Sequence, residues 1–88
     1  IVAVDPVEPA HLEIQAVDHL GLLYQIARAI YENGFDITFA RISTERGIAM
    51  DTFYIEPVLP GSKTDTQNLL KLRESITRII ESDSKAAG

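Results

Sequence analysis

The segment Asp18-His19-Leu20-Gly21-Leu22-Leu23 contains the residues best suited to bind a small ligand. Glycine has no Cβ, so the backbone amides around Gly21 are open to close approach. The first amides of a helix have no intrahelical partner, and the helix dipole favours negative charge there. If a helix begins at this segment, the sequence predicts a site for a small carboxylate.

This segment lies where a strand pattern changes into a helix pattern. Leu12, Ile14 and Ala16 alternate with other residues and predict a strand over about 11–17. Apolar residues then recur at helical spacing: Leu22, Leu23, Ile26, Ala27 and Ile30. We therefore expect a helix over about 21–32, ended by Asn33-Gly34.

The second half of the chain predicts a hairpin and a second helix. Residues 35–44 are rich in β-branched and aromatic side chains, which favours a strand. Its apolar parity shifts between Phe39 and Ala40, which indicates a bulge or a strand that is partly apolar on both faces. A loop at 45–47 leads to a return strand over 48–56. Thr64 and Gln67 resemble a capping box for a helix that ends near residue 82.

The order of these elements predicts an α+β fold, a ferredoxin-like βαββα sandwich with an antiparallel sheet that lacks its usual last strand. A short β-prone run over about 1–4 would fill the vacant edge position. We expect an edge strand and linker over 1–10, the main domain over 11–82 and a frayed tail over 83–88. Because the chain begins with Ile1 instead of methionine, we interpret it as a fragment of a longer protein.

Composition excludes several classes of function. The chain has 88 residues, a net charge of −5 and no cysteine. Its basic residues form no run, so no nucleic-acid partner is expected. No apolar run approaches the length of a membrane helix, so no membrane partner is expected either, and we predict a cytoplasmic protein. His11 and His19 are too isolated to suggest a metal site, no cofactor is implied, and no acid–base constellation indicates catalysis by this fragment.

Several segments, in order, resemble an ACT domain: Asp18-x-x-Gly21-Leu22-Leu23, Ile26-Ala27-x-x-Ile30 and Gly34-x-Asp36-Ile37. Two later segments, over 40–44 and 51–55, resemble more narrowly the C-terminal ACT domains of bacterial protein-PII uridylyltransferase, the uridylyl-removing enzyme of nitrogen control. Plant ACT-repeat proteins share the later segment. The resemblance covers most of residues 1–80 and identifies 11–82 as an ACT domain.

The resemblance implies regulation of an attached catalytic region by a small amino acid. Glutamine is favoured, because it is the metabolite sensed by uridylyltransferase-type domains. The implied ligand-binding residues are Asp18, His19, Leu20, Gly21, Leu22 and Leu23, with Asp36 and Ile37 beside that loop. The resemblance also implies pairing with a second ACT domain, as a homodimer or in tandem within a parent nucleotidyltransferase.

One departure from the family keeps a second hypothesis open. Asp18 and Asp36 stand where the best-known amino-acid-binding members tend to carry asparagine. Two carboxylates attract a ligand ammonium but repel its carboxylate, so the loop amides would have to hold the carboxylate. The alternative is a dimerisation or docking module that binds no ligand. Exposed apolar residues on the second helix, such as Leu70, would favour this alternative.

Some of these residues also have a purely structural interpretation. Asp18 is placed to cap the first helix, and Gly21 serves either ligand access or close packing. Asp36 either contacts ligand or bonds to nearby backbone amides. Asp51 shares the strand parity of Phe53 and is expected to point toward the core. If it is buried, it needs a partner such as Arg41, Arg46 or Thr44.

Overall fold

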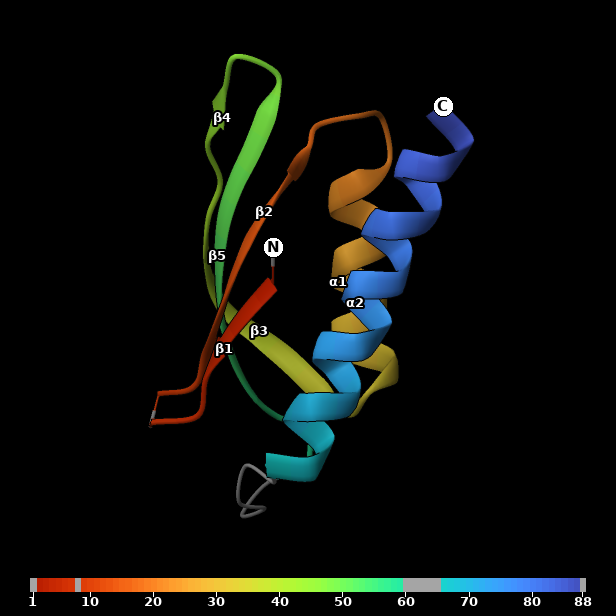
Figure 1. The fold of residues 1–88 in the computed structure, drawn as a ribbon. Coiled ribbons are helices and arrows are strands. Elements are labelled where there is room, and N and C mark those ends of the chain that lie inside the picture. The colour runs from red at the N-terminus through yellow and green to blue at the C-terminus, as the bar shows by residue number, and fades with distance from the viewer. Residues whose placement is uncertain (1, 8, 60–65, 88) are drawn as a thin grey trace.

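A computed structural model describes residues 2–7, 9–59 and 66–87. Its strands are β1 (Val2–Asp5), β2 (His11–Val17), β3 (Phe35–Arg41), β4 (Thr44–Glu45) and β5 (Ile48–Pro57), and its helices are α1 (Leu22–Glu32) and α2 (Thr66–Ala87). The strands form an antiparallel sheet in the order β1-β2-β5-β3, and β4 also pairs with β5. Both helices cover one face of the sheet, and the other face is open (Figure 1). The predicted α+β ferredoxin-like sandwich is confirmed.

Strand β1 occupies the edge position that the sequence left vacant. It pairs antiparallel with β2, with Val2 opposite Ile14 and Val4 opposite Leu12. Without this strand, β2 would present a row of unpaired backbone groups to solvent. The N-terminal run therefore completes the sheet, as predicted, although Ile1 itself lies outside the described residues.

The core forms between the sheet and the two helices. Alternate residues of β2 and β5 face the helices, which is why their apolar residues recur at every second position. The largest fully buried side chains come from both layers: Phe53, Leu12, Leu22, Ile26, Ile30, Leu69, Leu72 and Ile76. Burial of these residues drives the association of helices and sheet.

The predicted irregularity in β3 is a shift in register against β5 between Ile37 and Phe39, slightly earlier than the sequence indicated. A bulge reverses the face to which the following side chains point. Phe39 consequently lies on the open face, where its ring centroid is 6.0 Å from that of Tyr54. β3 ends at Arg41 instead of residue 44, because pairing with β5 is interrupted and resumes as β4.

The helix ends differ modestly from expectation. At the end of α1, the Asn33 backbone N–H and its side-chain Nδ2 both donate to the Ala29 carbonyl, and Gly34 adopts a φ of 88°. Helix α2 continues to Ala87, whereas the apolar stripe predicted an end near 82 and a frayed tail over 83–88. Lysine and alanine in that segment have high helix propensity, which permits the extension. The predicted capping box cannot be followed in the structure, because Thr64 lies outside the described residues.

Candidate ligand-binding site

Gly21 initiates α1 in a conformation that favours glycine. It is the N-cap residue, with φ 88° and ψ −6°. A Cβ built on it would meet nothing within 4 Å, so close packing does not explain the glycine. The positive φ explains why glycine is present, because residues with an L side chain rarely adopt that conformation. The interpretation of Gly21 as a close-packing residue is therefore wrong, and the space next to its Cα is open.

The turn into α1 leaves two backbone donors available. The Leu22 N–H donates to the His19 carbonyl at 3.2 Å, and the Gln25 N–H donates to the Gly21 carbonyl at 3.0 Å. Within the described residues, the N–H groups of Leu23 and Tyr24 have no such partner, and no side chain caps the helix. These two amides and the helix dipole provide the features expected of a carboxylate-binding turn.

The expectation that Asp18 caps α1 is wrong. The N-cap is Gly21, because the chain needs the residues between them to turn from the sheet onto the helix layer. The Asp18 backbone N–H instead donates to the Gly47 carbonyl at 2.8 Å, which ties the loop to the turn between β4 and β5. Its exposed side chain is therefore not used in capping and lies at the same end of the sheet as the loop.

The other loop residues have distinct environments. His19 is half-buried, and its Nδ1 lies 3.0 Å from the Leu20 carbonyl oxygen. Leu20 is fully exposed, Leu22 is buried in the core, and Leu23 is 48% exposed. Leu22 therefore anchors the loop, and the apolar side chains of Leu20 and Leu23 face solvent.

Within one chain, the structure does not bring Asp36 and Ile37 beside this loop. Asp36 pairs with Glu56, whereas Asp18 lies opposite Gly47 at the other end of β5. Glu56 and Gly47 are nine residues apart along the chain, so Asp36 and Asp18 are separated by about 30 Å along the sheet. Asp36 Oδ1 accepts a hydrogen bond from the Ile37 N–H at 3.0 Å, in agreement with its structural interpretation. Helix α1 connects the two ends, so the predicted site residues form two separate groups (Figure 1).

Asp51 is buried, as its strand parity predicted, with 4% of its surface exposed. Its Oδ1 accepts a hydrogen bond from the Ser43 N–H at 3.3 Å, at the break between β3 and β4. The partner is thus a backbone amide and none of the three side chains suggested by the sequence. Burial raises the pKa of the Asp51 carboxyl, the Ser43 N–H lowers it, and the negative charge of Asp18 raises it further.

The raised pKa predicts how stability depends on pH. The folded chain holds the Asp51 proton more tightly than the unfolded chain, so ionisation of this group opposes folding. The unfolding free energy is expected to fall as pH rises from the ordinary value of 3.8 through the raised pKa. Asp51→Asn keeps an acceptor for the Ser43 N–H. We expect this variant to have a higher unfolding free energy at neutral pH. Urea titrations at several pH values should show that the pH dependence contributed by Asp51 is lost.

Asp36→Asn is the matched control for this prediction. Asp36 is exposed and, like Asp51, accepts a hydrogen bond from a backbone N–H. The control should leave the unfolding free energy nearly unchanged at every pH. A neutral-pH stability of Asp51→Asn at or below that of the unmodified chain would contradict the proposed cost of burying this charge.

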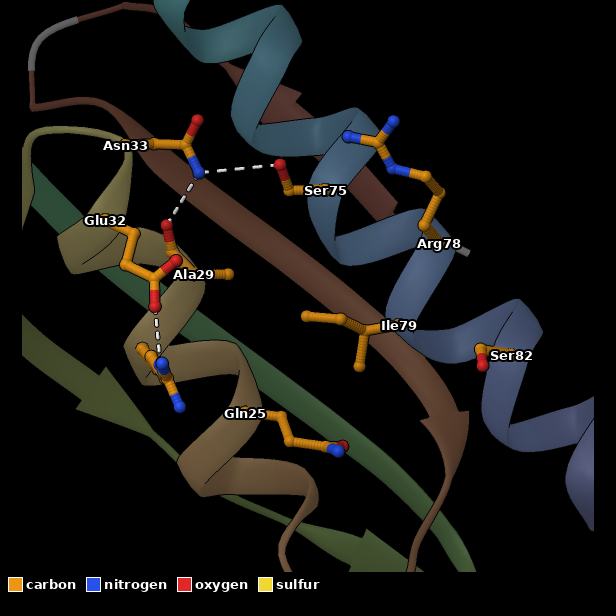
Figure 2. Close-up of a pocket in the computed structure, with 9 residues that line it drawn as sticks. Gln25, Ala29, Glu32, Asn33, Ser75, Arg78, Ile79 and Ser82 are labelled. Carbon is orange, nitrogen blue, oxygen red and sulfur yellow. Dashed lines mark hydrogen bonds and ion pairs between the residues drawn. The ribbon is translucent and has the colours of Figure 1, made fainter.

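The surface hollows lie elsewhere. A groove of about 500 Å³ between α1 and α2 is lined by residues that include Arg28, Glu32 and Arg78. The Asn33 side-chain amide donates a hydrogen bond of 3.5 Å to the Ser75 hydroxyl and so links the two helices (Figure 2). A second hollow, of about 490 Å³, involves residues of the sheet such as Arg41. Neither is lined by the predicted site residues. In one chain the loop is an open surface.

The described part of the chain lacks two further features. It holds no group of three or more histidine, aspartate or glutamate residues that could bind a metal ion. Neither of its helices combines the length and the apolar character needed to cross a membrane.

The fold, with a glycine-led turn between its first core strand and helix, is that of a small ferredoxin-like α+β domain. The comparisons identify the family: this chain is a regulatory ACT domain. It is 39% identical over 69 residues, or 78% of its length, to an ACT domain-containing protein of Arabidopsis thaliana. No family model and no solved structure matches it.

Two bacterial enzymes are similar over a comparable part of the chain. It is 37% identical over 70 residues, or 80% of its length, to the bifunctional uridylyltransferase/uridylyl-removing enzyme of Novosphingobium aromaticivorans. It is 32% identical over 73 residues, or 83% of its length, to the enzyme of the same name from Azospirillum brasilense. The chain spans only 16% of the Arabidopsis protein and 7% and 8% of the two enzymes.

Proposed function

We propose that this ACT domain binds a small amino acid, with glutamine as the favoured ligand, and that binding controls an attached catalytic region. The loop amides of Leu23 and Tyr24 would hold the ligand carboxylate, and Asp18 would attract its ammonium. The similarity to uridylyltransferase/uridylyl-removing enzymes supports a nucleotidyltransferase as the parent. The ligand can act as a switch only if it has different affinities for two states of that parent.

The single observation that carries this proposal is the position of the two groups of site residues at opposite ends of α1. A two-fold axis midway between the two groups would set two copies antiparallel, with their β3 edges toward each other. The loop of each copy would then lie beside Asp36 and Ile37 of the other, and the predicted site would form twice. A tandem ACT domain in the parent would meet the same geometric requirement.

The surface between the two groups has the character of an interface. Leu23, Tyr24, Ala27 and Tyr31 follow helical spacing along α1, and all but Ala27 are among the exposed large apolar residues. Polar residues of α1 line the groove toward α2, so this apolar stripe lies on the side of β3. β3 ends the sheet, which leaves its outer backbone groups without a strand partner in the described residues.

A second function, docking without ligand, is favoured by a different observation. Leu70 on α2 is 49% exposed and lies outside the α1 stripe. In addition, the charge of Asp18 acts on Asp51, and such carboxylates oppose the approach of a ligand carboxylate. This alternative predicts association through α2 that no amino acid affects.

Leu23 and Leu70 provide a matched pair of variants, because their exposed fractions are almost equal. Leu23→Glu should weaken self-association by about 100-fold, since it places an unpaired charge in the proposed interface, and it should remove the heat of glutamine binding at the loop. Leu70→Glu should behave like the unmodified chain. We would measure mass by light scattering and binding by calorimetry, with serine and glutamate as control ligands.

The same measurements separate the two functions. A stable dimer with no glutamine heat, which only Leu70→Glu dissociates, would establish docking and contradict ligand binding. A monomer that binds no glutamine would contradict a site built between two copies of this chain. Covalently joining two copies would then test the tandem arrangement directly.

A further inference from the structure

The open face of the sheet contains a hollow that the ACT resemblance does not assign. It has a volume of about 490 Å³, within the range of small-molecule sites. The lining residues that matter here are Glu13, Gln15, Arg41, Glu45, Met50 and Thr52. These residues come from four strands, β2, β3, β4 and β5, and none of them belongs to the loop before α1.

The register of the sheet fixes the backbone spacing of the charged residues in this hollow. Glu13 of β2 is opposite Thr52 of β5, and Thr52 is opposite Arg41 of β3. These three residues form one cross-strand row, in which the central threonine separates the two charges. Their backbones are two strand spacings apart, or about 9.5 Å.

The opposite charges do not neutralise each other directly. Within the described residues, Arg41 forms no ion pair. Glu13 Oε1 lies 3.8 Å from His11 Nε2, a pair that is ionic only when His11 is protonated. Glu45 adds a second carboxylate to the rim of the hollow. The hollow therefore presents the Arg41 guanidinium and the carboxylates of Glu13 and Glu45, and the buried Asp51 also lines it. Arg41 and Glu13 are separated by one strand.

The geometry points to a zwitterion. We propose that this hollow is a second binding site for a free α-amino acid, with the ligand carboxylate on Arg41 and its ammonium on Glu13. The side chains of Arg41 and Glu13 both extend from this row, and a charge-assisted hydrogen bond of about 2.8 Å at each end would hold an α-amino acid between them. Thr52 forms the floor beneath the ligand backbone, and Met50 offers an apolar contact to its side chain.

The charges also exclude other common ligands. A phosphate or a polynucleotide would meet the carboxylates of Glu13 and Glu45, and a simple cation would meet Arg41. A zwitterion satisfies both signs at once. This site is distinct from the loop site, because none of its residues belongs to that loop.

The test is a titration of the 88-residue chain with glutamine, followed by the backbone amide signals in nuclear magnetic resonance spectra. Glutamine should shift the amides of Gln15, Met50 and Thr52 saturably. N-acetylglutamine lacks the ammonium and glutamine methyl ester lacks the carboxylate. The affinity of each should therefore be lower than that of glutamine by about tenfold or more. Arg41→Ala and Glu13→Ala should remove the shifts, and Arg73→Ala, an exposed arginine on α2, should retain them.

Gly21→Leu distinguishes this proposal from the loop site, because it should leave the open-face shifts intact. Shifts confined to residues 18–23 and 36–37 would support the loop site and overturn the second one. The second site is also overturned if Arg41→Ala binds as the unmodified chain does, or if N-acetylglutamine binds as tightly as glutamine. Absence of saturable shifts on the open face up to the solubility of glutamine would overturn it as well.

Discussion

Replacing Phe53 with alanine is expected to lower the free energy of unfolding by about 3–5 kcal/mol. Phe53 is 1% exposed and lies in β5, between Leu12 of β2 and Ala40 of β3. Strands hold β5 on both sides and helices cover the face to which Phe53 points, so the cavity cannot collapse easily. Because small domains are stable by only about 5–15 kcal/mol, urea unfolding followed by circular dichroism should show a large shift.

Phe39→Ala is the matched control for this core substitution. Phe39 is 60% exposed on the open face, where Tyr54 is its aromatic neighbour. Its loss should cost less than about 1 kcal/mol, since surface substitutions remove little buried area. Similar losses for both phenylalanines would contradict the bulge in β3, because the bulge is what directs Phe39 away from the core.

The architecture could be predicted from the sequence because its periodicities are strong. Leu12, Ile14 and Ala16 alternate cleanly, and the apolar stripe after Gly21 has helical spacing, so β2 and α1 were placed to within a residue. The edge role of β1 followed from topology, since the βαββα unit needs one more strand. Strand β4 was missed, because two residues cannot show a period.

The site was less predictable, because it depends on distances that spacing along the chain does not reveal. Asp18 has the right residue type for a cap, but the turn places Gly21 at that position. Asp36 follows α1 closely in sequence, yet the length of the helix carries it to the far end of the sheet. The burial of Asp51 was visible in strand parity, whereas its backbone partner depends on the break at Ser43.

Gly21→Leu is expected to weaken glutamine binding at the loop by about 100-fold or more while the fold is retained. The backbone of Gly21 has a positive φ, so any L side chain there costs about 1–2 kcal/mol of stability. The space beyond its Cα is empty, so a leucine meets no protein atom as it leaves the backbone. Its side chain instead occupies the approach to the Leu23 and Tyr24 amides. Calorimetry and urea unfolding measure the two effects separately.

Gly21→Ala separates strain from obstruction, because it imposes the same positive φ with only a methyl group. It should lose a similar amount of stability and keep most of the glutamine binding. If alanine and leucine abolish binding equally, the conformation of the turn controls the site and ligand access does not. If the leucine variant binds glutamine as the unmodified chain does, the ligand does not use this loop, and binding at the open face would have to account for any heat observed.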